Sequence, residues 1–244
     1  MKINILGVEI DDLSAAEVAD LAAGNLQIGG KTFIATPNPE MLVAAQKDGE
    51  FARALNSADI KIADGVGLKL GAKILKKELK NRVTGTDLMD RLCGLAAERG
   101  YSIYLLGAQN GVAREAAKRL STKFVQLKIA GAESGGKMDA WDSRVIVEHI
   151  NAVSPDMLFV ALGHGKQEKW IFENLEKLPS VKLAMGVGGA FDFFAGRAKR
   201  APRWMRDAGL EWLWRLIREP KRYKRIWNAA AVFPWLCLIK KSAR

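Results

Sequence analysis

The chain has 244 residues, of which 49% are hydrophobic, and its formal net charge is +11. This length allows one sizeable core, or a core domain with an appendage. Cys93 and Cys237 are the only cysteines, and His149 and His164 are isolated in sequence, which argues against a disulfide framework and a metal cluster. The N-terminus lacks the long apolar region of a signal peptide, so we expect a cytoplasmic protein.

Short apolar runs typical of β-strands alternate with helical patterns through the first 195 residues. Ser14 and Glu17 form a capping-box pattern that opens a helix, and Thr86 precedes a helix that ends at Gly100. The nearly continuous apolar strands indicate an α/β fold with a mainly parallel sheet and helices on both faces. The expected strands are Lys2 to Leu6, Lys31 to Ala35, Ile60 to Ala63, Ser102 to Leu106, Leu127 to Gly131, Met157 to Leu162 and Val181 to Gly186.

Polar side chains follow two of these strands, at the edge where such sheets bind ligands. Thr36, Asn38 and Glu40 can direct a hydroxyl, an amide and a carboxylate toward one pocket, although they also suit a capped turn. Asp64 follows the third predicted strand and is a candidate general base, with a turn-forming role as the alternative.

Three further loops carry polar groups or glycines where a helix is expected to begin. Arg82 precedes one helix N-terminus, a place that stabilises anions. Residues 107–111, GAQNG, precede another helix but lack the GxGxxG spacing of dinucleotide-binding proteins. Gln167 and Glu168 lie at the start of a third helix. Together these loops predict a site for a phosphorylated small molecule.

Residues 196–244 differ in charge from the rest of the chain. Residues 1–195 carry 24 basic and 24 acidic side chains, whereas residues 196–244 carry 14 basic and 3 acidic ones. Basic residues interleaved with tryptophans are typical of an amphipathic helix at a membrane interface. The apolar run from Ala229 to Ile239 is too short to span a bilayer. We expect peripheral binding to an anionic membrane surface, with an ordinary solvated basic face as the alternative.

Four arginines of this segment have helical spacing. Arg215, Arg218, Arg222 and Arg225 would form one stripe on a continuous helix, where their guanidinium groups suit phosphate. Pro220 offers the alternative that a second helix begins there and bends the stripe.

Seven motifs, in this order, resemble the WecG/TagA/CpsF family of bacterial glycosyltransferases: TPNPE, ADGVG, RVTGTDLM, LLGAQNGVAREAA, GHGKQEKW, GVGGAFDFFAGRAKRAP and GLEWLWRLIREPKRYKR. The resemblance implies a Rossmann-like catalytic body over residues 1–195. It also implies a membrane-docking helical appendage over residues 196–244 that completes the active site.

The activity implied by the resemblance is that of an inverting hexosyltransferase that needs no metal or other cofactor. Its donor is a UDP-sugar, and its acceptor is an undecaprenyl-diphosphate-linked N-acetylglucosamine at the inner face of the cell membrane. The products serve cell-surface polysaccharide or teichoic acid synthesis. N-acetylmannosamine is the best known donor sugar, and UDP-glucose and UDP-N-acetylmannosaminuronic acid are alternatives.

Carried onto this sequence, the family motifs place the catalytic base at Asp64, where a partly closed pocket would raise its pKa. We add Glu168 and Asp192 as binding candidates, the latter also suited to anchor the loop after the last strand. The GxPKQE motif of the family has Gly165 in its proline position here, preceded by His164, so we expect a looser loop. The substrate-binding positions implied by the resemblance are Thr36, Asn38, Arg82, Gln167, Arg215, Arg222 and Arg225.

Other classes of protein fit the sequence less well. A nucleic-acid-binding protein could use the basic, aromatic tail, but that reading leaves the polar strand-end loops unexplained. An oxidoreductase would need a dinucleotide fingerprint, and residues 186–189 are followed by no clear helix. A membrane adaptor without activity, and a homo-oligomer formed through the tail, stay open.

Overall fold

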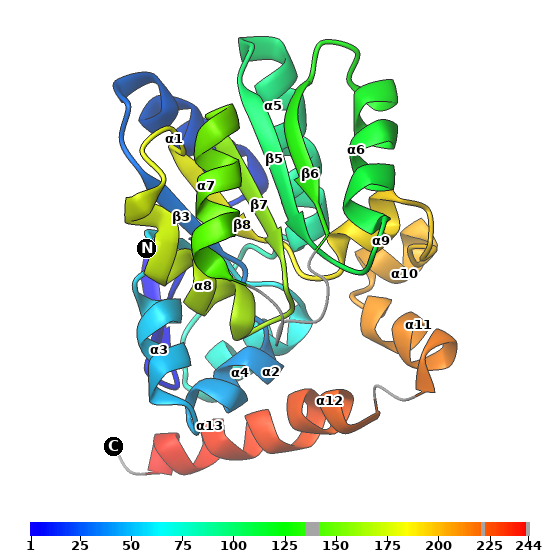
Figure 1. The fold of residues 1–244 in the computed structure, drawn as a ribbon. Helices are drawn as coiled ribbons and strands as arrows, with labels where there is room; N and C mark the ends of the chain where they lie inside the picture. The colour runs from blue at the N-terminus through cyan, green and yellow to red at the C-terminus, as the bar shows by residue number, and fades with distance from the viewer. Residues whose placement is uncertain (135–141, 221–222, 243–244) are drawn as a thin grey trace.

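The computed structural model describes residues 1–134, 142–220 and 223–242. Its central sheet has six parallel strands in the order β4-β3-β8-β7-β5-β6 (Figure 1). The fold is therefore α/β and Rossmann-like, as the sequence predicts. The strands are β3 (Thr32–Ala35), β4 (Ile60–Lys61), β5 (Ser102–Gly107), β6 (Lys128–Glu133), β7 (Met157–Ala161) and β8 (Leu183–Gly186).

Helices cover both faces of the sheet, and each face has its own hydrophobic core. One core contains residues of α1 (Ala15–Ile28), α5 (Gly85–Arg99), α6 (Val112–Lys123) and α9 (Ala190–Phe194). The other contains residues of α3 (Gly49–Asn56), α7 (Ser143–Val153), α8 (Lys166–Asn174) and the short helix η2 (Leu175–Lys177). Two-sided burial explains why β7 and β8 are buried at every position.

Caps define the helix ends close to where the sequence places them. Ser14 and Glu17 form the expected capping box of α1, and Gly100 ends α5 in a left-handed conformation. The predicted start of α5 after Thr86 is wrong. The hydroxyl of Thr84 accepts a hydrogen bond from the Asp87 backbone N–H at 3.2 Å, so the helix begins at Gly85.

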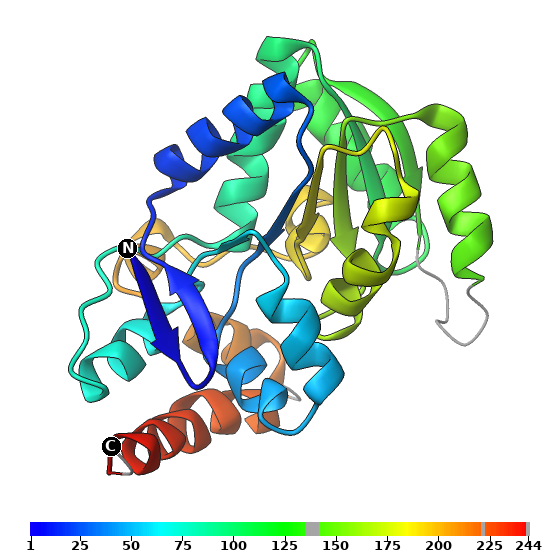
Figure 2. The same ribbon diagram turned by 90° about the vertical axis from the view of Figure 1, so that its left-hand side faces the viewer.

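The first predicted strand lies outside the main sheet. Strand β1 (Lys2–Ile5) pairs antiparallel with β2 (Val8–Asp11), which the sequence analysis missed. Leu6 and Gly7 connect the two strands with φ values of 51° and 87°, the conformation of a two-residue hairpin turn. Figure 2 shows this hairpin beside the end of the C-terminal helix.

The basic segment forms helices along one end of the body (Figure 1). Helices α10 (Arg203–Asp207) and α11 (Glu211–Arg218) lead to a continuous helical run. That run comprises α12 (Tyr223–Trp227), the π-helical η4 (Asn228–Val232) and α13 (Phe233–Ser242), and it packs on α2 (Pro39–Ala45) and α4 (Val66–Ile74). None of the helices in the described ranges is both long and apolar enough to cross a membrane.

The terminal helical run is amphipathic. Phe233 and Cys237 are completely buried against the body, and a Cβ atom on Gly71 would lie 2.5 Å from the Phe233 ring. The glycine therefore permits close contact between α4 and α13. The opposite side exposes Trp227, Trp235 and Leu238 to solvent.

The single arginine stripe expected from the sequence is wrong. Arg215 and Arg218 belong to α11, which ends before Pro220, whereas Arg225 belongs to α12. Arg222 lies outside the described residues. Arg215 and Arg225 therefore reach one pocket from two different helices.

Candidate active site

A pocket of about 150 Å³ lies at the carboxyl ends of β4, β3, β8 and β7, which are neighbours in the sheet. The loops after these four strands and the first turns of α2, α8 and α9 supply most of its wall, and α5, α11 and α12 supply the rest. This is the edge where open α/β sheets bind ligands. The lining residues are Thr36, Asn38, Met41, Asp64, Gly85, Thr86, Gly163, His164, Gln167, Val187, Gly188, Gly189, Ala190, Arg215 and Arg225.

Asp64 is the one carboxylate among these lining residues. Loss of water around the carboxyl group raises its pKa to about 6, although Arg215 and the Gly85 backbone N–H stabilise the ionised form. The backbone N–H of Asp64 donates to the Pro37 carbonyl at 2.8 Å, which fixes the loop after β4 against the loop after β3. An acid group that titrates near pH 6 suits proton transfer at neutral pH.

Thr36 and Asn38 line the pocket beside Asp64. Asn38 caps α2, because its side-chain oxygen accepts from the Met41 backbone N–H at 3.0 Å. The capped turn considered from the sequence is thus present, and it holds Asn38 at the pocket wall. The two readings are therefore compatible for Asn38, whereas the expectation that Glu40 also points into the pocket is wrong, because its carboxylate binds Arg225 and it is not among the lining residues.

Gln167 lines the pocket, whereas Glu168 lies behind it. The side-chain oxygen Oε1 of Gln167 accepts from the Gly188 backbone N–H at 3.0 Å, and its side-chain Nε2 donates to Glu168 Oε1 at 2.8 Å. Glu168 is completely buried, and loss of water raises its pKa to about 7. Glu168 is not among the lining residues; it accepts from the Gly165 backbone N–H and from Gln167, and Gln167 in turn binds the loop after β8.

Arg215 reaches the pocket from α11 and lies over the ring of Phe193, 4.7 Å from its centroid. A Cβ atom on Gly189 would lie 3.9 Å from Arg215 Nη1 and 3.8 Å from Asp192 Oδ2. Asp192 is therefore close to the pocket without lining it. Its carbonyl accepts from the backbone N–H groups of Arg197 and Ala198, which anchors the loop after α9.

Arg82 lies between the body and the appendage. Its guanidinium donates to the Arg206 carbonyl at the end of α10, at 2.8 Å, and it is not among the pocket-lining residues. Arg82 acts on Asp64 at longer range, as one of the charges that lower the aspartate pKa. In this position Arg82 connects the body to α10 and does not form part of the pocket wall.

Arg225 makes contacts that the sequence analysis did not anticipate. Its Nε donates to both carboxylate oxygens of Glu40, at 2.9 and 2.8 Å, and its Nη2 lies 3.2 Å from His164 Nδ1. Glu40 and His164 adjoin residues that the motifs do assign, but their partner is far along the chain, and only the fold reveals the contact.

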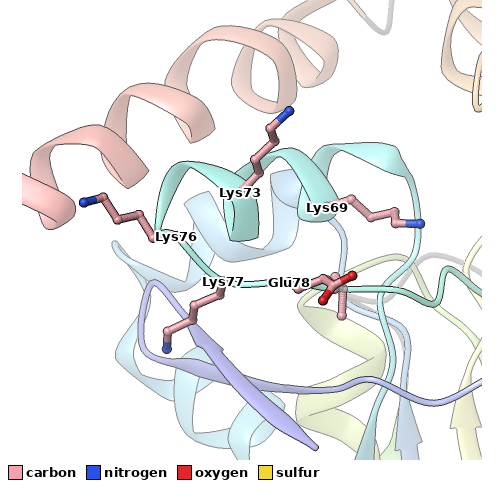
Figure 3. A pocket seen from close by; sticks show the side chains of 6 residues that line it. Lys69, Lys73, Lys76, Lys77 and Glu78 are labelled. Atoms are coloured by element: carbon pink, nitrogen blue, oxygen red, sulfur yellow. The ribbon is translucent and has the colours of Figure 1, made fainter.

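A second hollow of about 510 Å³ lies beside α4, away from the strand-end residues. It is lined by Lys69, Lys73, Lys76, Lys77, Glu78 and Leu79, and Figure 3 shows the lysine side chains pointing in different directions. Because these ammonium groups point in different directions, they suit an extended negatively charged surface better than a single bound anion.

The described parts of the chain contain no group of three His, Cys, Asp or Glu residues that could hold a metal ion. The positive groups that line the strand-end pocket are Arg215 and Arg225.

Comparisons with known proteins identify the family to which the chain is similar. The model of the glycosyl transferase WecG/TagA/CpsF family matches residues 3–244. Three similar proteins share the name N-acetylglucosaminyldiphosphoundecaprenol N-acetyl-beta-D-mannosaminyltransferase. The chain is 36% identical over 193 residues to that of Bacillus subtilis (strain 168), covering 79% of this chain and 74% of that protein. It is 34% identical over 217 residues to that of Bacillus spizizenii (strain W23), covering 89% and 83%. It is 33% identical over 227 residues to that of Staphylococcus aureus (strain MRSA252), covering 92% and 88%.

Proposed function

The chain belongs to the WecG/TagA/CpsF family of glycosyl transferases, and from this premise we propose that it transfers N-acetylmannosamine from a UDP-sugar to undecaprenyl-diphosphate-linked N-acetylglucosamine. The names of its relatives in Bacillus and Staphylococcus support this sugar and acceptor. One observation carries the mechanism. Asp64, a carboxylate with a pKa of about 6, lines a pocket whose wall also holds Arg215 and Arg225.

In the proposed reaction Asp64 acts as the general base. It takes the proton of the acceptor hydroxyl while the hydroxyl oxygen forms a bond to the anomeric carbon of the donor sugar. The bond from that carbon to the UDP oxygen breaks on the opposite side, and UDP leaves with the electron pair. A single displacement of this kind inverts the anomeric configuration. Ionised Asp64 predominates above pH 6, so the base is ready at neutral pH.

The leaving diphosphate needs positive charge as its own charge develops. Arg215 and Arg225 line the pocket and can supply charge-assisted hydrogen bonds to phosphate oxygens. We propose that these two arginines take the place that a divalent cation has in metal-dependent transferases, so that the reaction runs without a metal. Both belong to residues 196–244, so we propose that this segment is an appendage that completes the catalytic body of residues 1–195.

The test is UDP release from a panel of UDP-sugars in the presence of an undecaprenyl-diphosphate-N-acetylglucosamine analogue. We expect release with UDP-N-acetylmannosamine that depends on the acceptor. UDP-glucose and UDP-N-acetylmannosaminuronic acid are the competing donors in the same panel. Release with one of them would change the donor and keep the reaction class, whereas an intact chain inactive with every donor would contradict the proposal.

We also propose that the appendage binds the inner face of the cell membrane, where the lipid-linked acceptor would reside. Trp227 and Trp235 are exposed by 66% and 60%, beside a segment with a large excess of basic residues. The four divergent lysines lie on α4 or just after it, and α4 packs against α13, so these lysines can extend the contact to anionic headgroups (Figure 3).

Flotation with vesicles containing phosphatidylglycerol tests this membrane proposal. Trp227→Ala combined with Trp235→Ala should reduce binding, because two interfacial aromatic side chains are removed. Phe172→Ala is the matched control, since Phe172 is an exposed aromatic residue on α8. Equal binding of the double variant and the control would exclude the appendage as the docking surface.

A further inference from the structure

The contact between Arg225 and the body is concentrated in two side chains. Glu40 follows the Asn38 cap on α2, and only 14% of its side chain is exposed. Both of its oxygens accept from Arg225 Nε, while Arg225 Nη2 reaches the ring of His164 in the loop after β7. One guanidinium of the appendage is thus held by a residue in the first turn of α2 and by a residue in the loop after β7.

The geometry specifies the protonation state of His164. Arg225 is always charged and has only donors, so His164 Nδ1 must accept the hydrogen bond at 3.2 Å. The proton of a neutral ring then lies on Nε2, which faces Glu40 Oε1 at 3.7 Å. In this tautomer Nδ1 accepts from Arg225 and the Nε2–H group faces the Glu40 carboxylate. A doubly protonated ring would instead turn an N–H donor and a positive charge toward the Arg225 guanidinium, and the two cations would repel each other.

The loop that carries His164 depends on the residue after it. Gly165 has φ of +82°, whereas proline fixes φ near −65°. The Gly165 N–H also donates to Glu168 at 2.7 Å, and proline has no such donor. The proline that the GxPKQE motif would place here is therefore incompatible with this loop conformation, and glycine allows it.

We propose that Glu40 and His164 are positioning residues that hold Arg225 of α12 against the Asp64 pocket. The bidentate carboxylate sets the direction of the guanidinium, and the histidine fixes its far nitrogen. Arg225 is thereby ordered before substrate arrives, which reduces the entropy lost when it binds a diphosphate. Its role toward the diphosphate rests on the proposed function above, but its attachment to the body does not.

The network formed by Glu40, His164 and Arg225 also makes the attachment of α12 to the body sensitive to pH. Burial lowers the pKa of His164 below its ordinary value, with Glu40 opposing and Arg225 reinforcing this change. The charged side chains that face the ring are Glu40 from α2 and Arg225 from α12, and the pocket also holds Asp64 and Arg215. The network is intact at neutral pH and is lost when the pH falls far enough to protonate His164.

Hydrogen exchange of the backbone amides of residues 223–232 in the full chain, without donor or acceptor, tests the positioning role. Glu40→Gln should increase exchange in this segment about tenfold, because the charge-assisted pair is lost. The matched control is Glu50→Gln, since Glu50 is an exposed carboxylate paired with Lys169 on the body. Unchanged exchange in Glu40→Gln, with thermal unfolding like that of the control, would overturn the proposal.

Two substitutions of His164 separate its hydrogen bond from its charge. His164→Asn keeps an acceptor near the position of Nδ1 and does not titrate, whereas His164→Phe keeps a ring without an acceptor. After correction for the intrinsic rate, wild-type exchange in residues 223–232 should rise from pH 7.5 to a lower pH at which His164 is protonated. It should be pH-independent in His164→Asn and raised at both pH values in His164→Phe. The same pH rise in wild type and His164→Asn would contradict the role of His164.

Activity measurements distinguish this inference from the proposed function. Glu40→Gln should raise the donor KM more than it lowers kcat, because the fraction of molecules with Arg225 in place falls. A wild-type chain that transfers no sugar, together with faster exchange in Glu40→Gln, would refute the function and leave the positioning role standing. Active wild type with unchanged exchange in Glu40→Gln would refute the positioning role alone.

Discussion

Arg215 lies over the ring of Phe193, with its guanidinium carbon 4.7 Å from the ring centroid. One residue comes from the appendage helix α11 and the other from α9 of the body. A cation over an aromatic face is attracted by the negative charge density of the ring. The contact therefore helps to hold the Arg215 guanidinium at the wall of the pocket that Asp64 lines.

Arg215→Ala should lower kcat about 10²–10³-fold, the range measured when one donor to a developing negative charge is removed. Arg218→Ala is the matched control, because Arg218 lies over Trp214 on the same helix. Steady-state rates of UDP release provide the measurement. Equal losses in the two variants would indicate general damage to α11 instead of a missing charge in the pocket.

The same substitution should shift the pH profile. Arg215 lowers the pKa of Asp64, which is about 6 in its presence, so removing the arginine raises that pKa. The general base must be ionised, hence kcat/KM of wild type should fall as the pH drops below about 6. In Arg215→Ala the fall should begin at a higher pH. A profile that moves to lower pH would contradict the assignment of Asp64 as the base.

Asp64→Asn should lower activity about 10²–10⁴-fold, the usual contribution of a positioned base. Asp20→Asn, an exposed aspartate of α1, is the matched control and should keep full activity. UDP release and circular dichroism spectra measured on the same samples separate lost chemistry from lost structure. A rate for Asp64→Asn like that of the control would exclude Asp64 as the base.

Asp64→Asn should also stabilise the fold at neutral pH. The folded protein raises the aspartate pKa from 3.8 to about 6, so the folded state binds the proton more tightly than the unfolded chain. Stability from this group is therefore lost as the pH rises from about 4 to 6. Urea unfolding at pH 7.5 should show the variant more stable by about 1–3 kcal/mol, with a smaller difference at pH 5. A less stable variant at pH 7.5 would contradict this prediction, because it would show that the interactions of the ionised carboxylate outweigh its loss of water.

Removal of metals should leave the rate unchanged. Arg215 and Arg225 line the pocket, and the described residues form no cluster suited to a cation. UDP release after dialysis against EDTA, then with added Mg²⁺ or Mn²⁺, provides the measurement. A rate lost on dialysis and restored by either ion would contradict the proposed charge stabilisation by arginine.

The sequence predicts the elements whose signals are local. The capping box at Ser14 and Glu17 and the left-handed end at Gly100 depend on residues within one helical turn, and both are confirmed. The predicted start of α5 is two residues too late. Thr84 and Thr86 are both suitable N-cap residues, and the structure uses Thr84. The β1–β2 hairpin was missed because Leu6 and Gly7 give a weaker turn signal than the usual Asn-Gly pair.

The site was predictable where the motifs are compact. Asp64, Thr36, Asn38 and Gln167 line the same pocket, as their positions after parallel strands indicate. The partners of Arg225 were not predictable, because Glu40 lies 185 residues and His164 lies 61 residues from it along the chain. The periodicity of apolar residues predicts helices and strands, but it does not predict contacts between residues so far apart along the chain. These contacts depend on where the bend after α11 directs α12.

The two cysteines are intrinsic reporters of two different opening events. Cys237 is buried only where α13 covers α4, and burial raises its pKa to about 11. Cys93 lies on α5 and is buried in the core on the opposite face of the sheet. An alkylating reagent would therefore modify Cys237 when the terminal helix lifts from the body, and Cys93 only when the sheet itself unfolds. The ratio of the two labelling rates would measure, in the unmodified chain, how much more often the appendage detaches than the protein unfolds.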